Sequence, residues 1–599
     1  MTHGLLRRAM LVTALLVALP LTLRGEPPAA DPRAALRGID EVIDRALVDQ
    51  KIPGASVGVV VGDDLILLKG YGRRDVAGDK PMTPDTMIQI ASITKQFTVA
   101  SLGTLVRRGK LEWDKPVRDV LPEFRLNDDY ATLHATPRDL VTHRIGLPRH
   151  DMVWFGSTLP REELYRRLRY LPFSRDIRTE FQYNNFMFMT AGYLAGRING
   201  TDYETLVQTA IFDPLGMKRS TFSMKQMMAD ADRAMGYQLD NQRNIVPHEL
   251  TSAEAMAPTG AILSTARDLT AYMRMMLAGG SFDGKPVLQP ADVAAMMQPQ
   301  TPIGPSPFPE IGFRSYGMGF FVENYRGHEI AHHGGNLNGA AAMIMFVPKS
   351  RIGVIVLTNR TGARLRDGLP REIIDRLLGL PSANMIERNA EMERKALTGE
   401  EAAKSAGVSD RKTGTTPSHA LVDYAGRFSH PAYDDVEIAH ADGKLSLRFH
   451  DFSAPLEHWH YDLFKTPSDK TLELDDVRVQ FITDMQGELS SLAIAFEPSV
   501  DPIRFARTPP PQMLERAFLE RFVGVYDVGG VELSVRLRED GVLQTVQLGT
   551  VRDLVPVRGT LFRVKQVTGL SMEFLAAPDG TIDRLAIYSG GSTIAPRKK

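Results

Sequence analysis

The chain has 599 residues, of which 43% are hydrophobic and 24% are charged, and its formal net charge at pH 7 is −1. This length and composition predict several ordinary globular domains, and the near-zero charge argues against nucleic acid or an anionic membrane as a partner. Cysteine is absent, which excludes disulfides, thiolate metal ligands, a cysteine nucleophile and a lipid anchor on cysteine.

The first 30 residues have the layout of a signal peptide. Arg7 and Arg8 precede an apolar run over 9–23, and a polar, Pro-containing segment follows it. The run is short for a membrane span, so we expect a periplasmic or secreted protein with no membrane span beyond the signal peptide. Because Arg24 interrupts the small-residue pattern of a cleavage site, an uncleaved anchor is the alternative.

Residues 31–380 predict one domain that combines a sheet with helices. Apolar residues at 39, 42, 43, 46 and 47 have the spacing of an amphipathic helix. Residues 52–72 predict two strands around a Gly-Asp-Asp turn, residues 340–359 predict a second strand pair, and a helix is expected over 368–380. Strands at both ends of a helix-rich region favour one sheet that the two ends of the domain close together.

The remainder of the chain predicts a linker and two similar β units. Residues 381–418 are charged and then rich in Gly, Thr and Pro, which indicates a linker with some helix. Short alternating segments and Asp-Gly turns then occur twice, predicting small β-barrel domains over 419–508 and 509–599. Matching residues lie 98 positions apart and, further on, 93 apart: Tyr424, Gly426, Asp442, Gly443, Leu445, Leu456 and Phe464 with Phe522, Gly524, Asp540, Gly541, Leu543, Leu554 and Phe562, and Phe481, Gly487, Leu492, Ala493 and Ile494 with Phe574, Gly580, Leu585, Ala586 and Ile587.

A lysine stands in the apolar stretch 87–110, three residues after Ser92. Apolar residues at 93, 97, 100 and 105 predict a helix, so Ser92 and Lys95 would be neighbours on one face at its first turn. A serine hydroxyl needs a base to become a nucleophile, and a buried lysine with a lowered pKa can serve. Because an idle lysine on an apolar helix would be costly, the Ser-Ile-Thr-Lys segment predicts a nucleophile and its base.

Several segments in order resemble the serine β-lactamase and penicillin-binding protein family, especially its class C β-lactamase-related branch with esterases and D-aminopeptidases. The resemblance covers residues 35–380. IASITKQFT is similar to the nucleophile motif, FQYNNFMFMTAGYLAG to the Tyr-x-Asn motif, and HEIAHHGGNLNGA to the third motif, with His in place of Lys. LVTHRIGLPRHD resembles a further family region but carries Arg144 and Ile145 in its middle, so we assign no catalytic role there.

The resemblance implies an α/β (α+β) β-lactamase/transpeptidase-like domain, with an antiparallel sheet flanked by helices, and a covalent mechanism without cofactor or metal. Ser92 would attack a carbonyl and form an acyl-enzyme. Lys95 and Tyr183 would share the base role, with Tyr183 as a phenolate. Asn185 would orient Lys95 and the substrate amide.

The third motif would border the substrate. His333 would lie on the sheet edge opposite Ser92, and Gly334 and Gly335 would contact the substrate. The backbone N–H groups of Ser92 and Asn336 would form the oxyanion hole.

We therefore expect an exported serine hydrolase that acts on small esters, D-amino acid peptides or β-lactam and peptidoglycan-related amides. His333 in place of Lys removes a fixed cation, which favours an esterase or aminopeptidase-like activity. The alternative is a non-hydrolytic penicillin sensor or peptidoglycan-binding protein. The partner is a small-molecule or peptide substrate, and the oligomeric state is left open.

Some D-aminopeptidase-like relatives carry two β-barrels, which implies that the repeats here limit substrate size and do no chemistry.

Three other motifs are expected to be structural. Ser56 lies in a Gly-x-Ser-x-Gly string, but the strand follows it instead of preceding it. Lys412 begins a literal Lys-Thr-Gly that falls in the polar linker. His458 and His460 lie on one strand face without further candidate zinc ligands.

Overall fold

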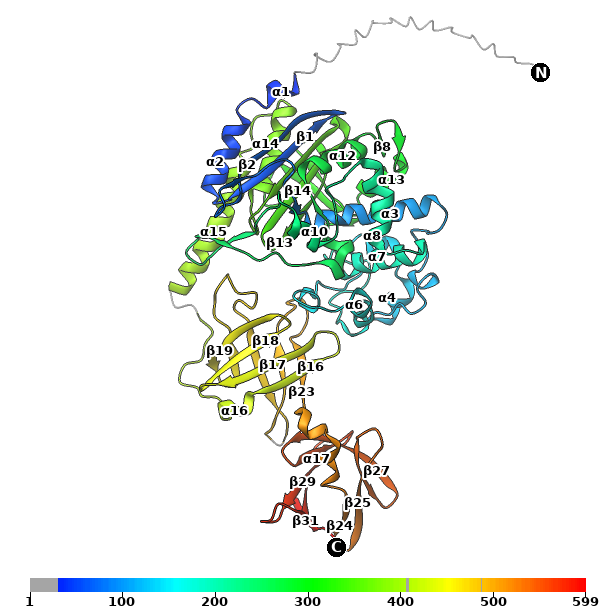
Figure 1. Ribbon diagram of the computed structural model, residues 1–599, viewed down its shortest axis with the longest axis vertical. Coiled ribbons are helices and arrows are strands. Elements are labelled where there is room, and N and C mark those ends of the chain that lie inside the picture. Colours follow the sequence, from blue (N-terminus) through cyan, green and yellow to red (C-terminus); the bar gives the residue numbers. More distant parts are fainter. Residues whose placement is uncertain (1–30, 406–408, 486, 599) are drawn as a thin grey trace, which may run out of the picture.

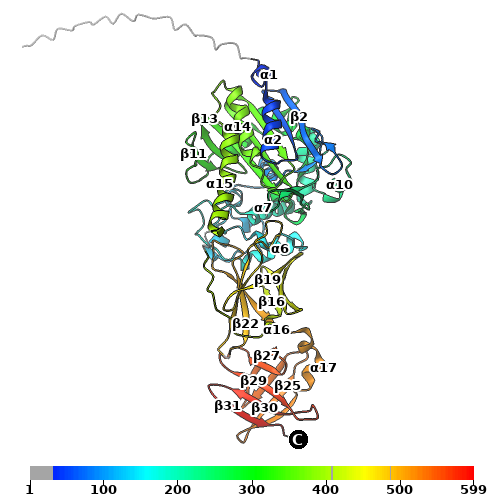
Figure 2. The same ribbon diagram turned by 90° about the vertical axis from the view of Figure 1, so that its left-hand side faces the viewer.

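The computed structural model describes residues 31–405, 409–485 and 487–598, so the predicted signal peptide lies outside the described residues. A large mixed domain, a first all-β unit and a second all-β unit follow one another along the long axis of the molecule (Figures 1 and 2). No helix within the described ranges is long and apolar enough to span a membrane.

The large domain is built on a nine-stranded antiparallel sheet. β1 lies beside β15 in its interior, so strands from both ends of the domain meet, as the strand positions in the sequence predict. The strand order is β10 (Thr301–Pro302), β11 (Ile311–Tyr316), β12 (Phe321–Tyr325), β13 (His328–Leu337), β14 (Ala340–Val347), β15 (Ile352–Thr358), β1 (Gly54–Val61), β2 (Asp64–Asp75) and β3 (Lys80–Pro81).

Helices cover both faces of this sheet, which explains why its central strands are apolar throughout. Along β14, Met343 and Met345 belong to the core under α2 (Ile39–Asp49) and α14 (Leu365–Leu377). Ile344 and Phe346 belong to the core on the opposite face, where α12 (Ala266–Leu277), α3 (Thr94–Arg107) and α7 (Asn185–Asn199) lie (Figure 1).

Shorter elements complete the domain around α3 and α7. They are the 3-10 turn η1 (Ala91–Ile93), α4 (Asp129–His134), α5 (Pro137–Leu140), α6 (Arg161–Arg167), α8 (Tyr203–Val207), α10 (Met224–Ala229), α11 (Ala257–Gly260), α13 (Pro290–Met297) and the strand pairs β4 (Ile88–Gln89) with β7 (Leu263–Ser264), β5 (Tyr237–Leu239) with β6 (Ile245–Pro247), and β8 (Ser281–Phe282) with β9 (Lys285–Pro286). Helix α15 (Met385–Ser405) leads away from the domain toward the first all-β unit.

The first all-β unit is a closed eight-stranded barrel, and the second is an eight-stranded sheet whose first and last strands meet through a bridge from Tyr526 to Arg597. The first barrel consists of β16 (Gly426–His430), β17 (Asp434–Ala441), β18 (Lys444–Phe449), β19 (Phe452–His460), β20 (Leu463–Lys465), β21 (Arg478–Thr483), β22 (Leu489–Ile494) and β23 (Ile503–Thr508). The second consists of β24 (Gly524–Val528), β25 (Val531–Leu537), β26 (Leu543–Gln547), β27 (Thr550–Arg558), β28 (Leu561–Val564), β29 (Ser571–Ala576), β30 (Ile582–Tyr588) and β31 (Ser592–Pro596), preceded by α17 (Arg516–Glu520).

The sequence repeat is visible in the two barrel cores. The Asp-Gly turns join β17 to β18 and β25 to β26, and Gly443 and Gly541 adopt positive φ angles of 71° and 83° that suit glycine. Each core buries three aromatic rings at matched positions, with centroids 4.9–5.6 Å apart in the first barrel and 4.6–5.5 Å apart in the second: Tyr424, Phe464 and Phe481, and Phe522, Phe562 and Phe574.

The two barrels are joined to the rest of the molecule differently. The core of the large domain continues without a break into the first barrel, whereas the second barrel has a core of its own. Phe155 of the large domain contacts Phe452 of the first barrel, with ring centroids 5.4 Å apart. Between the barrels, the Arg558 guanidinium binds the Glu488 carboxylate at 2.6–2.7 Å. The first barrel is therefore structurally continuous with the large domain.

Candidate active site

A sharp turn places Ser92 at the entrance of α3. Ser92 lies in η1, and Ala91 before it has a φ of 47°, a left-handed conformation that is uncommon for residues other than glycine. The turn is pressed against β13 at Gly335, where a Cβ atom would lie 2.1 Å from the carbonyl oxygen of Ile90. Only glycine therefore fits at position 335 while the serine turn keeps its place.

Strand β13 presents an unpaired edge beside this turn. Its pairing with β12 ends at His332, whereas its pairing with β14 continues to Leu337. Within the described chain, the segment from Gly334 to Asn336 therefore has a partner strand on one edge only. An extended acyl group can bind such an edge through main-chain hydrogen bonds. Gly334 and Gly335, which the resemblance expects to contact the substrate, belong to this edge.

The structure brings four of the expected catalytic side chains together. The Lys95 amine nitrogen Nζ lies 3.1 Å from Ser92 Oγ and 2.8 Å from Asn185 Oδ1. Lys95 Nζ also lies 3.0 Å from the carbonyl oxygen of Thr259 in α11. From the other side, the Tyr183 hydroxyl donates to Ser92 Oγ across 2.9 Å. Ser92 thus lies between an amine and a phenol.

Burial favours the neutral form of the Lys95 amine. The side chain is fully buried, and its desolvation, aided by the positive charge of Arg149, holds the Lys95 pKa well below its usual value. The Thr259 carbonyl oxygen and Asn185 Oδ1 can only accept hydrogen bonds, so they take the two N–H groups of the neutral amine. The remaining lone pair then faces the Ser92 hydroxyl, which is the arrangement of a general base.

Tyr183 is a phenol in the resting site. Its burial raises the pKa of the hydroxyl to about 12, although the hydrogen bond to Ser92 and the charge of Arg149 act in the opposite direction. The expectation that Tyr183 is poised as a phenolate is therefore wrong, because desolvation outweighs the nearby cations. The geometry gives Ser92 Oγ one neighbour that can accept its proton, the Lys95 amine, and one that donates to it, the Tyr183 hydroxyl.

His333 lies near these groups but has both ring nitrogens occupied. Nδ1 is 2.7 Å from the Gly334 carbonyl oxygen, and Nε2 is 3.0 Å from the Tyr316 hydroxyl. A carbonyl oxygen only accepts, so Nδ1 carries the proton and Nε2 accepts from Tyr316. Burial also holds the His333 pKa well below its usual value. His333 is therefore a neutral ring, with its centroid 6.2 Å from that of Tyr183.

Two charged residues that were not expected from the sequence contact the group around Ser92. Asp151 Oδ1 accepts a hydrogen bond of 2.8 Å from Asn185 Nδ2, and Asp151 Oδ2 accepts one of 2.7 Å from Arg149 Nε. The Arg149 guanidinium lies over the Tyr183 ring, 4.9 Å from its centroid. Both residues fall in LVTHRIGLPRHD, where opposite charges flank a histidine directly after Leu-Pro. This local pattern of charges is the signal in the sequence from which Arg149 and Asp151 could have been found.

The structure gives the remaining motifs other surroundings. Ser56 is buried in β1 and donates to the Thr83 carbonyl oxygen across 2.8 Å. The Lys412 backbone N–H donates to His460 Nδ1 across 3.3 Å, and His458 Nε2 lies 2.9 Å from the Tyr461 carbonyl oxygen. Among the residues that the structure describes, no three His, Asp or Glu side chains are grouped as a metal site requires.

Comparison with known proteins identifies the family. The Beta-lactamase family profile matches residues 39–378, and the chain belongs to this family. A profile for a domain of unknown function (DUF3471) matches residues 410–507, which include the first barrel. The predicted family and fold class are thereby confirmed, including the two all-β units behind the catalytic domain.

Two curated relatives extend the match beyond the catalytic domain. "Unguisins hydrolase ungD'" of Aspergillus campestris (strain IBT 28561) is 29% identical over 415 residues, covering 66% of this chain and 76% of the relative. "Unguisins hydrolase ungD" of Aspergillus violaceofuscus (strain CBS 115571) is 28% identical over 457 residues, covering 70% and 80%. The octameric penicillin-binding protein homologue from Pyrococcus abyssi has a similar fold, with a TM-score of 0.53 and 23% identity over 78% of this chain and 99% of that one. The protein is a serine hydrolase of the Beta-lactamase family.

Proposed function

We propose that the enzyme cleaves esters or amides through an acyl-enzyme on Ser92, with Lys95 as the base. The observation that carries this proposal is the buried Lys95 amine. Its two N–H groups have acceptors at Asn185 and Thr259, which leaves its lone pair toward the Ser92 hydroxyl 3.1 Å away.

In the first half-reaction, Ser92 Oγ attacks the substrate carbonyl carbon and its proton passes to Lys95 Nζ. The carbonyl electrons move onto oxygen, where the backbone N–H groups of Ser92 and Asn336 are the proposed donors. When the tetrahedral intermediate collapses, the bond to the leaving group breaks. The leaving group takes the Tyr183 hydroxyl proton, and the proton on Lys95 replaces it. The acyl group then remains as an ester on Ser92.

In the second half-reaction, water attacks the Ser92 ester and gives a proton to Lys95. The C–Oγ bond breaks, Lys95 passes the proton it received to Ser92 Oγ, and the acid product leaves with Lys95 neutral again. One proton of the water thus ends on Ser92, and its hydroxide ends on the acid product. The atoms and charges of the step balance without an oxidant, metal or cofactor.

For the substrate, we propose small esters or D-amino acid amides. The neutral His333, with both ring nitrogens bonded, offers no fixed cation to a substrate carboxylate. The two curated relatives carry names of hydrolases, which supports turnover over a role as a non-hydrolytic penicillin sensor or peptidoglycan-binding protein.

A cation at the open edge of β13 favours a second class of substrate. An Arg366 guanidinium nitrogen, Nη1, donates to the Gly335 carbonyl oxygen, and its Cζ lies 4.0 Å from where a Cβ would stand on Gly334. A guanidinium there can bind a carboxylate in a bidentate fashion. Substrates with a free carboxylate, such as β-lactams and peptide C-termini, are therefore the second candidate.

The test is covalent labelling followed by turnover. A fluorophosphonate probe and a fluorescent penicillin are applied to the native enzyme and to Ser92→Ala, with Ser56→Ala as the matched control. We expect labelling by at least one probe to disappear only in Ser92→Ala, and p-nitrophenyl esters or D-amino acid anilides to be turned over. Labelling that survives Ser92→Ala contradicts the proposal, and labelling without turnover supports the non-hydrolytic alternative.

We also propose export by the N-terminal segment, which rests on the sequence pattern alone. Fractionation of expressing cells and N-terminal sequencing of the mature chain test it. A chain that keeps its initiating segment and stays in the cytoplasm contradicts export.

A further inference from the structure

We infer that the first barrel holds the surroundings of the catalytic lysine in place through His150. Barrel side chains anchor this residue, and its two neighbours along the chain contact catalytic side chains. The inference rests on the proposed function, because it takes Lys95 as the base.

His150 is buried between the catalytic domain and the first barrel, and each of its nitrogens has a partner. Its backbone N–H donates to Glu497 Oε2 of the barrel across 3.0 Å. Its Nδ1 lies 2.6 Å from the hydroxyl of Tyr433, also of the barrel, and its Nε2 lies 2.8 Å from the Pro172 carbonyl oxygen. Because that carbonyl only accepts, Nε2 donates to it and Nδ1 accepts from Tyr433.

The backbone at His150 has a conformation that is uncommon for residues other than glycine. Its φ of 47° lies in the left-handed region, where residues other than glycine persist only when the surrounding structure holds them. Glu497 and Tyr433 supply two of the three anchoring groups, so the barrel contributes directly to this local conformation.

The residue after His150 fixes the orientation of a catalytic amide. Asp151 Oδ1 accepts from Asn185 Nδ2 at 2.8 Å and from Trp154 Nε1 at 2.9 Å. Because Asn185 Nδ2 donates to the Asp151 carboxylate, the Oδ1 atom of the same amide must face Lys95. A flipped amide would set N–H groups against the N–H groups of Lys95, and the lone pair of the base would lose its direction toward Ser92.

The residue before His150 places a positive charge beside the base. Arg149 is held by Asp151 and lies over the ring of Tyr183. Its charge favours the neutral form of Lys95. Both neighbours of His150 therefore act on the Ser92 site. Arg149 acts through its charge, and Asp151 acts through the Asn185 amide, although the Asp151 charge itself shifts the Lys95 pKa upward.

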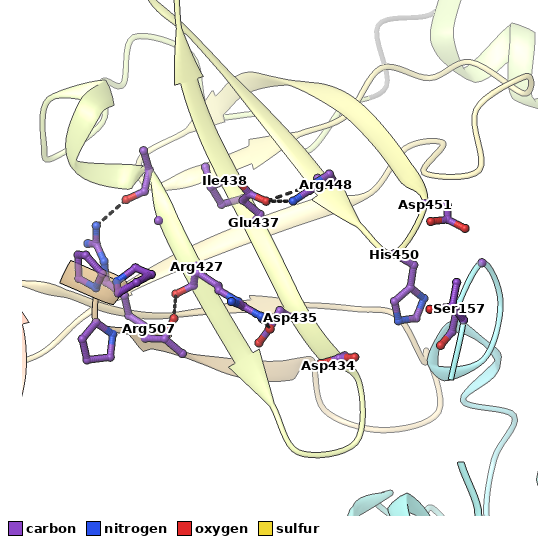
Figure 3. A pocket seen from close by; sticks show the side chains of 18 of the residues that line it. Ser157, Arg427, Asp434, Asp435, Glu437, Ile438, Arg448, His450, Asp451 and Arg507 are labelled. Carbon is purple, nitrogen blue, oxygen red and sulfur yellow. Dashed lines mark hydrogen bonds and ion pairs between the residues drawn. The ribbon is translucent and has the colours of Figure 1, made fainter. Parts of the chain in front are cut away.

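The far end of the same loop is also bound to the barrel. His450 Nδ1 donates to the Phe155 carbonyl oxygen across 2.9 Å, and a Cβ on Gly156 would lie 2.4 Å from the Phe452 ring. Figure 3 shows His450 facing the loop at Ser157, beside a cavity of about 770 Å³. The segment 150–156 is thus attached to the first barrel at both ends.

The experiment compares three anchor variants of the full-length enzyme with a matched interface variant. Tyr433→Phe removes one hydroxyl, Glu497→Ala removes the acceptor of the backbone N–H, and His150→Gly keeps the left-handed backbone but removes the ring. The control is Asn241→Ala. It loses two hydrogen bonds to the barrel away from this loop, one of 3.3 Å to the Ser468 carbonyl oxygen and one of 3.1 Å from the Lys470 backbone N–H.

We expect each anchor variant to lower kcat about 10- to 100-fold with little change in KM, since small misplacements remote from the chemistry can cost about 10²-fold. The acid limb of the kcat/KM profile should also move to higher pH, because water would reach Lys95 and its pKa would rise. The groups that face Lys95 and contribute to this limb are Tyr183, Arg149, Asp151, His143 and His333. Asn241→Ala should leave both quantities unchanged.

The inference is overturned if Tyr433→Phe and Glu497→Ala keep the native kcat and acid limb, or if they lower only the melting temperature, as a purely structural contact would. Failure of the proposed function gives a different result from failure of this inference. Activity would then survive Ser92→Ala, independently of the result for the anchor variants.

Discussion

Lys95 Nζ lies 3.1 Å from Ser92 Oγ, one helical turn along the same face, while Asn185 and Thr259 take up its two N–H groups. The relationship joins sequence spacing to chemistry. A spacing of three residues makes the contact possible, and burial of the amine lowers the Lys95 pKa, as the proposed base role requires.

Loss of either partner of Ser92 should slow turnover. We expect Lys95→Ala to lower kcat about 10²- to 10⁴-fold, the usual contribution of a general base. Tyr183→Phe should lower kcat within the same range, because the leaving group loses its nearest proton donor. Steady-state kinetics on a p-nitrophenyl ester measure both. Near-native kcat in Tyr183→Phe would remove Tyr183 from the proton path.

The buried lysine should be a burden on stability that depends on pH. Between the lowered pKa of folded Lys95 and about 10.4, its value in an unfolded chain, the unfolded state binds the extra proton. Stability contributed by this group therefore rises with pH and is lowest at acid pH. We expect Lys95→Met to unfold at higher denaturant than the native enzyme at about pH 7, with a smaller difference at about pH 10. A constant difference would contradict the lowered pKa.

A methyl group at position 335 should disturb the serine turn. Its carbon would lie 2.1 Å from the Ile90 carbonyl oxygen and 3.0 Å from the Ala91 Cβ, so the turn must shift. We expect Gly335→Ala to cost about 1–3 kcal/mol of stability, as overpacking does, and to slow acylation of Ser92. Gly304→Ala is the control, since nothing lies within 4 Å of its added carbon. Equal acylation rates in the two variants would show that the close contact does not position Ser92.

Removal of the two barrels should have unequal effects. The sequence suggests that the repeats only limit substrate size, so that a chain ending near Leu380 would still acylate. The continuous core and the His150 anchors change this expectation for the first barrel. A chain ending near residue 508 should acylate normally, and one ending near residue 380 should acylate slowly or fail to fold. Normal acylation by the shorter chain would contradict the structural continuity.

Arg366 should separate the two candidate substrate classes. If its guanidinium binds a substrate carboxylate, Arg366→Ala will raise KM for carboxylate-bearing substrates and leave neutral esters unaffected. Paired measurements on a cephalosporin and a neutral p-nitrophenyl ester give this comparison. Equal changes in KM for the cephalosporin and the neutral ester would indicate that Arg366 only holds Gly335 in place.

The parts of the site that the sequence could predict depend on local spacing and order. Ser92 and Lys95 are neighbours because they share a helix turn, and Tyr183 and Asn185 come from one recognisable segment. The protonation of Tyr183 could not be predicted in this way, because it follows from burial that only the packed structure defines. Likewise, the His150 anchors join residues about 280–350 positions apart, and no local pattern encodes such contacts.

The same division applies to the fold. The continuous apolar run of β14 and the matched Asp-Gly turns of the barrels are local signals, and both appeared in the sequence. The continuity of the first barrel with the catalytic domain is not local. It depends on side chains such as Phe155 and Phe452, which are far apart in the sequence and share no local pattern.

In the proposed mechanism, Ser92 carries the acyl group and Lys95 makes its hydroxyl reactive. The most direct measurement is peptide mass spectrometry on enzyme quenched during turnover of a slow ester, in the native protein and in Lys95→Ala. We expect an added acyl mass on the peptide that contains Ser92 in the native enzyme, and a much slower appearance of that mass in Lys95→Ala. An adduct on another residue, or one that forms at the native rate without Lys95, would contradict this mechanism.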